Sequence, residues 1–244
     1  MRKNIIWLIV WLCLLGWWTI FWLWTYSPVW LSMWIYNPIS WFYEEKNYQD
    51  TELMFIISTD FFWNNSLQKF LDDKHPLSTN NIPDIVRINS DFTSNKSSDF
   101  YLRKEAAEAF EKMAWAFSNA FGFKAKLTIN SAWRSQDYQR KLANGCSNTR
   151  CAKPWTSEHE AGLALDLWVN WWNINALSGK YYSWLKNNAH LYGFHNTYQK
   201  WMEIDWKMVE PWHRRYVWVE LATLLYEHNQ TFSEFFYENV EKKM

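Results

Sequence analysis

The chain has 244 residues, which is enough for one domain of ordinary size together with additional segments. It carries 25 lysines and arginines against 25 aspartates and glutamates, so its net charge is zero and nothing indicates a nucleic-acid partner. Two residue counts are unusual, because there are 21 tryptophans and only 6 glycines, whereas glycine makes up about 7% of an average protein.

The amino-terminal segment is predicted to be a membrane anchor. Residues 1–4 form a short positively charged start, and residues 5–24 carry no charged side chain. A helix of about 20 residues spans about 30 Å, the thickness of the hydrocarbon core of a bilayer. A cleaved signal peptide is the alternative, but its apolar region usually has about 7–15 residues, and no small-residue cleavage site follows here. Because Arg2 and Lys3 would stay in the cytoplasm, we expect a single-pass protein of the cell membrane whose body lies outside the cytoplasm.

Residues 25–74 are interpreted as a juxtamembrane spacer. Their first half is rich in aromatic side chains that could form an interfacial belt, and Leu53–Ile57 is a possible strand. The sequence leaves open whether this region packs on the domain that follows or only separates it from the membrane.

An amphipathic helix that faces the core is predicted from Leu102 onward. Apolar side chains recur there at helical spacing, with Ser98 or Asp99 as the expected cap and Gly122 as the stop. The next segment, residues 124–129, alternates polar and apolar residues and is predicted to be a strand.

Ser131 and Arg134 follow directly after this strand, where functional side chains commonly lie. Ser135 can cap the next helix, which carries Gln139. The loop that follows contains Cys146 and Cys151. Two cysteines without a second pair make a poor zinc site, so a local disulfide is favoured if this loop lies outside the membrane.

The most informative stretch is Ser157–Asp166. His159 is followed seven residues later by Asp166, which lies in an apolar run that is predicted to be a strand entering the core. A carboxylate in such a strand needs a partner, either a turn, an arginine or a metal ion. Zinc accepts both imidazole nitrogen and carboxylate oxygen, and a catalytic zinc usually has three protein ligands. Glu210–His213 offers a third ligand together with a spare carboxylate.

The carboxy-terminal part is predicted to be mainly helical. Ser178 is expected to begin a helix that ends at Gly193, and residues 217–227 predict a second one. Thr231–Glu234 is a capping box that begins a last amphipathic helix, residues 232–242. Because strands and helices mix without regular β-α-β alternation, the sequence predicts an α+β fold with a small antiparallel sheet flanked by helices.

The two motifs, Ser-x-His-x6-Asp and Glu-x-x-His, resemble together the signature of the VanY-type D-alanyl-D-alanine carboxypeptidases. These zinc metallopeptidases belong to a group that also includes lysostaphin-like enzymes and the hedgehog amino-terminal domain. The matching segments are Leu77–Pro83, Tyr101–Met113, Ser131–Ser135, Tyr192–Phe194 and Glu210–Val217. The resemblance implies a hedgehog/D-Ala-D-Ala-peptidase-like zinc carboxypeptidase domain over residues 75–228, followed by a C-terminal helix in residues 229–244.

The resemblance also implies the roles of individual residues. The proposed zinc ligands are His159, Asp166 and His213, and Glu210 is the proposed general base. Arg134 would hold a carboxylate or stabilise the oxyanion, with an ordinary surface salt bridge as the alternative. The positions expected near the substrate are Ser131, Gln139 and Ser157, whereas His75, His190, His195 and His228 match no ligand position and are expected to be surface or packing residues.

The function that follows from the resemblance is a membrane-anchored zinc carboxypeptidase. It would remove a terminal D-alanine from peptidoglycan stem peptides, either from a pentapeptide (DD activity) or from a tetrapeptide (LD activity). The alternatives are an endopeptidase that cuts cross-bridges and a non-catalytic zinc-containing domain that binds the cell wall. The presence of Glu210 and Arg134 argues against the non-catalytic domain.

The tryptophans lead to a separate hypothesis. Trp155, Trp206 and Trp218 stand where the VanY-type enzymes usually have glycine, whereas Trp212 matches a tryptophan of that family. An excess of tryptophan and a deficit of glycine would have one common cause if the gene came from a bacterium that reads UGA as glycine. The alternative is a protein that is naturally rich in tryptophan and fits bulky indoles beside the active-site loop.

Overall fold

The main sheet of the computed structural model is antiparallel throughout. Its strands are, in spatial order, β3 (Leu127–Ser131), β4 (Ala164–Val169), β7 (His213–Tyr216) and β6 (Phe194–His195), with β5 (Trp172–Asn173) paired to β4. A second, two-stranded sheet joins β1 (Ile85–Arg87) to β2 (Tyr101–Arg103). The chain thus has the mixed helix-and-strand fold with small antiparallel sheets that the sequence predicts.

The structure describes residues 60–95, 98–173, 179–201, 203 and 206–243. All of them belong to one compact unit, Ser58–Met244. Within these residues, no helix combines the length and the apolar character that a membrane span requires. The predicted anchor, the predicted strand Leu53–Ile57 and Ser178 lie outside the described residues.

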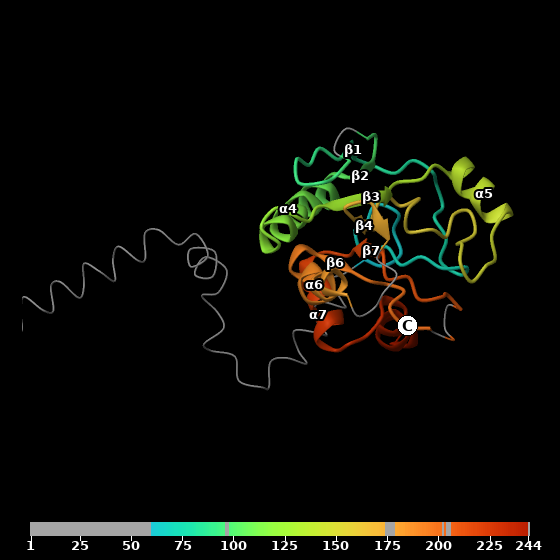
Figure 1. Ribbon diagram of the computed structural model, residues 1–244. Coiled ribbons are helices and arrows are strands. Elements are labelled where there is room, and N and C mark those ends of the chain that lie inside the picture. Colours follow the sequence, from blue (N-terminus) through green and yellow to red (C-terminus); the bar gives the residue numbers. More distant parts are fainter. Residues whose placement is uncertain (1–59, 96–97, 174–178, 202, 204–205, 244) are drawn as a thin grey trace, which may run out of the picture. The chain divides into compact units, whose positions relative to one another are not determined.

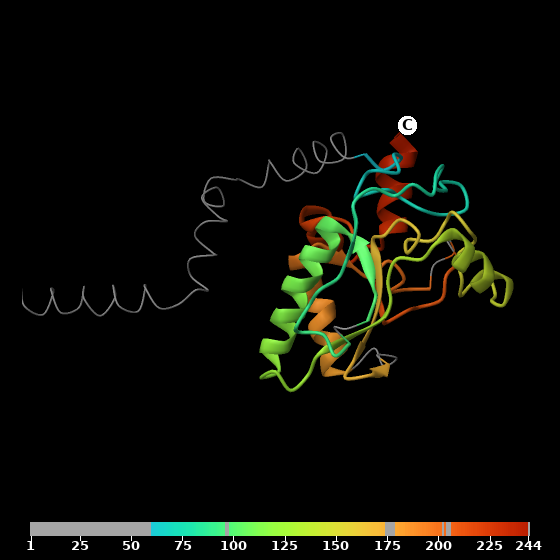
Figure 2. The same cartoon turned by 90° about the horizontal axis from the view of Figure 1, so that it is seen from above.

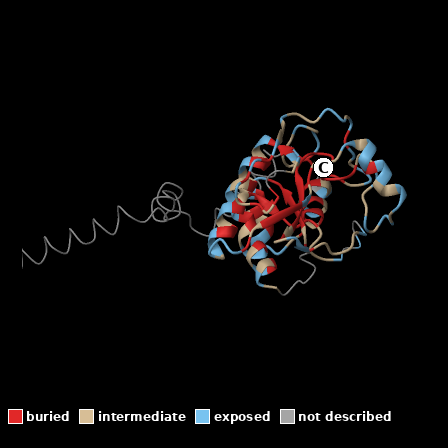
Figure 3. Ribbon diagram, turned by 45° about the horizontal axis from the view of Figure 1, so that its top comes forward, coloured by how far each residue is buried: buried red, intermediate tan, exposed pale blue. Residues whose placement is uncertain are grey.

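The helices surround the main sheet (Figure 1). They are α4 (Lys104–Ala120), α5 (Gln136–Asn144), α6 (Lys180–Asn188), α7 (Val219–Glu227) and α8 (Phe232–Phe235), with 3-10 turns η2 (Ala189–Tyr192) and η4 (Glu241–Lys243) and the π-turn η3 (Phe236–Val240). Helices α4 and α6 lie side by side against the sheet in both views (Figures 1 and 2), and the rings of Phe117 and Trp184 meet between them at 5.2 Å. The most buried residues are concentrated in the strands at the centre (Figure 3).

Helix α4 begins later than its apolar pattern predicts. Residues 101–103 pair with β1 as a strand, so the helix starts at Lys104, and its cap residue, Arg103, makes no side-chain cap bond. The predicted cap by Ser98 or Asp99 is therefore wrong. Asp99 instead forms an ion pair with Arg87 at 2.9 Å.

The register of β4 places the site. Asp166 lies opposite His213 on one neighbouring strand and opposite Ser131 on the other. A bulge between Ile129 and Ser131 shifts the pairing at the end of β3, and such bulges commonly re-aim side chains next to active sites. Because side chains alternate along a strand, Leu165 on the opposite face of β4 is fully buried in the core.

The end of the predicted spacer is part of the folded unit. Phe70 stacks on Phe236 of the C-terminal helical segment with ring centroids 3.9 Å apart, and Phe61 contacts the same ring at 6.0 Å. The capping box predicted at Thr231 is present and begins α8. Residues 60–74 therefore pack against the C-terminal helix. For this part of the predicted spacer, the sequence had left open whether it packs on the domain or only separates it from the membrane.

Candidate metal centre

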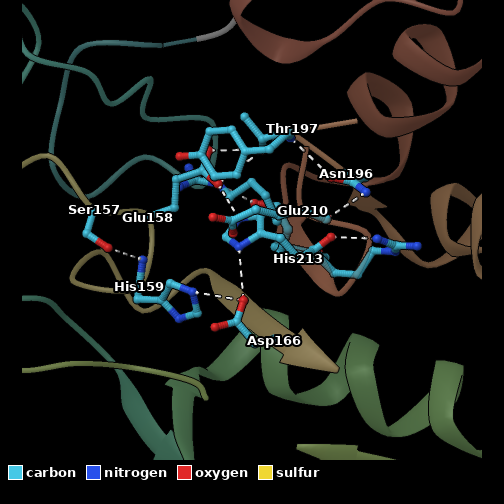
Figure 4. Close-up of polar contacts among 12 residues, drawn as sticks. Ser157, Glu158, His159, Asp166, Asn196, Thr197, Glu210 and His213 are labelled. Carbon is cyan, nitrogen blue, oxygen red and sulfur yellow. Dashed lines mark hydrogen bonds and ion pairs between the residues drawn. The ribbon is translucent and has the colours of Figure 1, made fainter. Parts of the chain in front are cut away.

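The three predicted ligands meet beside the sheet. His159, Asp166 and His213 each offer one ligand atom, all within 4.8 Å of one another, and all three residues are buried (Figure 4). Two of them come from the adjacent strands β4 and β7, and His159 comes from the turn before β4. Gly162 closes this turn with a φ of +69°, where an added Cβ would lie 2.4 Å from Ile85 Cδ1. The positive φ therefore favours glycine between His159 and β4.

The hydrogen bonds of the two imidazoles decide which nitrogen is free to bind a metal. His159 Nδ1 lies 2.7 Å from the carbonyl oxygen of Ala132 and must donate to it. His213 Nε2 lies 2.7 Å from Glu158 Oε2. The remaining nitrogens, His159 Nε2 and His213 Nδ1, lie 3.4 and 3.2 Å from Asp166 Oδ1. Two imidazole lone pairs and one carboxylate oxygen thus converge, a donor set that fits zinc.

Charges concentrate at this point of the core. Burial would raise the pKa of Asp166, but the neighbouring His159 and His213 hold it well below its usual range. Burial would lower the pKa of His213, but hydrogen bonds to Asp166 and Glu158 raise it to about 9. Two buried carboxylates thus attract positive charge, which a proton on His213 or a metal cation can supply.

Glu210 lies beside this group, in the turn before β7. Burial, reinforced by the negative charge of Asp166, raises the pKa of its carboxyl group to about 7. Its backbone is held at both ends, because its N–H donates to Tyr198 O at 2.9 Å and its carbonyl accepts from Asn196 Nδ2 at 3.1 Å. A carboxyl group with a pKa near neutrality is suited to accept and return a proton.

Arg134 is held by three side chains. Its Nη2 donates to Asp166 Oδ2 at 2.8 Å, its Nε to Ser131 Oγ at 2.9 Å and its Nη1 to Gln139 Oε1 at 3.4 Å. Gln139 is fully buried, and its Nε2 donates to Ala152 O. Ser131 and Gln139 thus support Arg134 from outside the cavity lining, and their predicted contact with substrate stays a prediction.

The site opens into a cavity of about 380 Å³. Of the predicted site residues, it is lined by Arg134, Ser157, His159, Asp166, Glu210, His213 and the two cysteines, and further by Asn130, Leu142, Arg150, Ala152, Glu158, Trp168, Tyr198, Lys207 and Trp212. The Ser157 hydroxyl accepts a hydrogen bond from the N–H of His159 at 3.3 Å. Cys146 and Cys151 are joined by a disulfide, which closes the loop after α5 at the wall of this cavity.

Sequence reasoning missed several of these residues. Glu158 is bonded to His213, and its only sequence signal was a charge directly beside a ligand in an otherwise buried segment. Tyr198, whose ring lies 4.8 Å from that of His213, and Lys207 come from an irregular segment with no pattern of its own. Only the tertiary fold brings them to the cavity.

The four other described histidines take no part in the group. His190 is buried and stacks on Tyr226 at 3.9 Å, and burial lowers the pKa of His195 to about 3. His75 pairs with Asp72, and His228 is exposed. Within the described part of the chain, no other cluster of histidine, cysteine and carboxylate side chains is arranged to hold a metal ion.

Comparison with known sequences gives one family. Residues 99–219 match the family model described as VanY, D-alanyl-D-alanine carboxypeptidase. The chain is 36% identical over 111 residues to a D-alanyl-D-alanine carboxypeptidase of Enterococcus faecalis (strain ATCC 700802 / V583), covering 45% of this chain and 40% of the relative. It is 35% identical over 155 residues to the putative carboxypeptidase YodJ of Bacillus subtilis (strain 168), covering 58% and 55%. The chain thus spans about half the length of the curated relatives it matches.

Solved structures share the fold. The LdcB LD-carboxypeptidase superposes with a TM-score of 0.61 at 28% identity, covering 71% of this chain and 87% of that one. An L,D-carboxypeptidase DacB from Streptococcus pneumonia gives 0.50 at 25% identity, with 68% and 84% covered. The vancomycin resistance D,D-pentapeptidase VanY, solved in complex with Zn(II), gives 0.54 at 23% identity, with 68% and 96% covered. The last likeness supports the fold alone.

Proposed function

The region of residues 99–219 belongs to the VanY family, and from this premise we propose that the chain is a zinc-dependent carboxypeptidase acting on peptidoglycan stem peptides. It would hydrolyse the last peptide bond and release D-alanine. The observation that carries the proposal is the convergence of His159, Asp166 and His213 at the cavity, with Glu210 beside them. Two histidines and a carboxylate leave room for a fourth position, as catalytic zinc sites require.

In this proposal the three ligands hold the metal and Glu210 moves the proton. When bound, zinc would supply a Lewis acid that polarises the scissile carbonyl and favours ionisation of water. Glu210, with a pKa of about 7, accepts the proton of the attacking water and later delivers it to the departing amine of D-alanine. Both transfers use the same carboxylate oxygen atoms, so the group returns to its starting state after each turnover.

Arg134 is proposed to stabilise the substrate's negative charge. Three of its hydrogen bonds go to protein side chains, whereas a guanidinium has five N–H groups. The remaining N–H groups are available in the cavity that Arg134 lines. They can bind the terminal carboxylate or the oxyanion that develops on the scissile carbonyl.

The experiment that tests the proposal uses the full chain and defined muropeptides. Released D-alanine is followed by mass spectrometry with pentapeptide, tetrapeptide and cross-linked substrates in parallel. We expect release of D-alanine from one of the two linear peptides. Cleavage of the cross-bridge alone would instead show an endopeptidase, and would contradict the carboxypeptidase.

Glu210→Gln separates the enzyme from a non-catalytic binding domain. The amide keeps the shape of the carboxylate but cannot take a proton, so D-alanine release should fall by about 10²–10⁴-fold. Zinc content should stay unchanged, because Glu210 is not one of the converging ligands. A variant with undiminished release would contradict the role of Glu210, and a loss of zinc would make it a ligand.

The location of the enzyme is proposed from the sequence of residues 1–24. The uncharged run after Arg2 and Lys3 supports a single membrane span with the catalytic domain on the outer side. In intact cells without a wall, an added protease should then digest the domain. Resistance to protease that disappears only after lysis would contradict this topology.

A further inference from the structure

Glu158 is a buried carboxylate directly behind a proposed metal ligand. It is 3% exposed, and its Oε2 accepts from His213 Nε2 at 2.7 Å. The hydroxyl of Thr197 lies 3.1 and 3.0 Å from its two oxygens (Figure 4). An ionised carboxylate is unfavourable in a protein interior unless such partners compensate it, so these contacts fix where the group lies.

The contact with Glu158 determines which nitrogen of His213 carries the proton and which can bind a metal. When Nε2 carries the proton and donates to Glu158, Nδ1 holds the lone pair on the side of Asp166 and His159. His159 is oriented in a comparable way by the carbonyl of Ala132, which belongs to the backbone. Of the two imidazoles, only His213 depends on a side chain for this orientation.

We propose that Glu158 is a positioning residue of the metal centre. It selects the tautomer of His213, fixes the plane of its ring and thereby raises the affinity for zinc. This inference rests on the proposed zinc centre and adds to it a residue that is not one of the three ligands. Partners of this kind typically change metal affinity by about 10–100-fold when they are removed.

A purely structural role is the competing explanation. The charge of the fully buried Arg215 also acts on Glu158, so the carboxylate could serve only to balance that guanidinium in the core. The two explanations differ in what they predict. A structural residue changes the melting temperature, whereas a positioning residue changes the zinc affinity of the folded protein.

The test measures zinc affinity of the full chain by competition with a chromogenic chelator. Glu158→Ala should weaken binding about 10–100-fold, and Glu158→Gln less, since its amide oxygen still accepts from Nε2. Glu160→Gln is the matched control, because this neighbouring buried carboxylate bonds the N–H groups of Trp155 and Ser157 and not a ligand. Its affinity should equal that of the wild type. With cobalt in place of zinc, only Glu158→Ala should alter the visible spectrum markedly.

The remaining results of the experiment decide between the positioning role of Glu158, a structural role and the failure of the proposed function. If Glu158→Ala does not fold, Thr197→Val replaces it, since it removes the hydroxyl that holds the carboxylate, and a several-fold loss of affinity is then expected. Unchanged zinc affinity in the folded Glu158 variants, or in Thr197→Val, overturns the inference even if their melting temperatures fall. A wild-type chain that binds no zinc overturns the proposed function itself.

An independent observation concerns the backbone of four tryptophans. Trp155, Trp171, Trp206 and Trp218 have φ angles of +76°, +71°, +54° and +75°. The glycines at 122, 162 and 193 have φ angles of +58°, +69° and +78°. Positive φ is an outlier for a bulky side chain, because Cβ approaches the following carbonyl oxygen. The four tryptophans therefore have backbone conformations that are typical of glycine.

Trp171 is the clearest example of a tryptophan at a position that favours glycine. The sequence alone did not identify it. Val169 pairs directly with Trp172, so Asn170 and Trp171 form a two-residue hairpin loop between β4 and β5. Both loop residues have positive φ, 49° and 71°, which is the pattern of a type I′ turn. Asn-Gly is a strongly preferred sequence for this turn. A tryptophan at the second position conflicts with it, whereas a glycine satisfies it.

We infer that positions 155, 171, 206 and 218 are glycine in the protein as its native host makes it, because the host reads UGA as glycine. At three of these positions the indole is exposed and is not part of the packed core. Trp171, Trp206 and Trp218 are 60%, 59% and 40% exposed. The inference is independent of the zinc centre, since it rests on backbone angles and composition.

The coding sequence and the native protein test this inference together. The four positions should carry UGA and Trp212 should carry UGG, and peptide masses from the native host should show glycine at all four. In the recombinant chain, Trp171→Gly should raise the melting temperature by about 2–4 °C, whereas Trp212→Gly should lower it. UGG codons at these positions, or tryptophan masses in the native peptides, would overturn the inference.

Discussion

Glu210, the proposed general base, lowers the stability of the fold at neutral pH. Its pKa of about 7 lies above the usual 4.5, so between these values the folded chain keeps a proton that the unfolded chain releases. Glu210 therefore does not reduce the free energy of unfolding below about pH 4.5. The free energy of unfolding falls as the pH rises from 4.5 toward 7, and above pH 7 it stays at the lower value. The raised pKa that suits Glu210 to its proposed role thus destabilises the metal-free fold at neutral pH.

Glu210→Gln should remove this pH-dependent loss. In the metal-free chain we expect the variant to be more stable than the wild type by about 1–2 kcal/mol at pH 8, because one pKa unit corresponds to about 1.4 kcal/mol and the side chain is partly open to solvent. Near pH 4.5 the two proteins should be equally stable. Urea unfolding at both pH values measures the difference, and an equal gain at both would contradict the assigned pKa.

Arg134 should not tolerate replacement by lysine. A lysine cannot make the separate bonds to Ser131 and Asp166 that the guanidinium makes, and it loses the planar fork. Arg134→Lys should therefore lower kcat/KM for D-alanine release by about 10²–10³-fold. Arg140→Lys on the exposed face of α5 is the control, because the Arg140 guanidinium makes its ion pair with the exposed Asp137 of the same helix. Equal activity of both variants would contradict the role of Arg134.

At the residue scale, the sequence was sufficient where chemistry is unusual. A carboxylate in an apolar strand and two histidines with a nearby spare carboxylate predicted the group that the structure brings together. It was not sufficient for residues whose role depends on burial and on contacts made only in the folded chain. Glu158 was missed because a buried carboxylate and a solvated one look the same in a sequence. Gln139 was expected near the substrate, but its burial behind Arg134 follows only from the tertiary fold.

At the scale of elements, the register of β4 with its two neighbours decides the site. Ser131, Asp166 and His213 lie in one row across three strands, and periodicity cannot predict such a register between strands distant in sequence. Alternation, a local signal, predicted a strand at residues 124–129 with Leu127 and Ile129 facing inward, and both side chains are buried. Its bounds were wrong, because β3 covers Leu127–Ser131 and Ser131 is its last residue rather than the start of the next loop. The start of α4 was not, because the pairing of β1 with β2 overrides the apolar pattern there.

The loop after α5 should depend on its disulfide. The bond between Cys146 and Cys151 closes a loop with a sequence separation of 5, for which the chain-entropy estimate is about 2 kcal/mol. The double variant Cys146→Ser with Cys151→Ser should lower stability by up to that amount and weaken substrate binding more than it lowers kcat. Thiol labelling of denatured, unreduced protein from the native host should modify neither cysteine. Labelling of both would show that the bond does not form.

At the scale of the whole molecule, the candidate metal centre joins β4 and the turn before it to β7, which is distant in the chain. His159, Asp166 and His213 come from a turn and two strands of the core, so a bound metal stabilises the folded state over the unfolded one. Chelation should therefore lower the melting temperature of the full chain, and added zinc should restore it. A melting temperature that is independent of zinc would contradict a metal site in the folded core.

The fold class was predictable from the sequence, but the packing of distant segments against one another was not. The mixture of helices and short strands predicted α+β with an antiparallel sheet, as the structure has it. The packing of residues 60–74 on the C-terminal helix was undecided from sequence, because aromatic residues such as Phe61 and Phe70 fit both a membrane interface and a protein core.

The most direct test of the central claim is a zinc titration of the metal-free chain with D-alanine release as the readout. The preferred linear muropeptide is present throughout, and bound zinc and released D-alanine are measured in the same samples. We predict that release is absent without metal, rises in proportion to bound zinc and reaches its limit at about one zinc per chain. Release that survives exhaustive chelation, or no release at full zinc occupancy, would contradict the claim that this chain is a zinc carboxypeptidase.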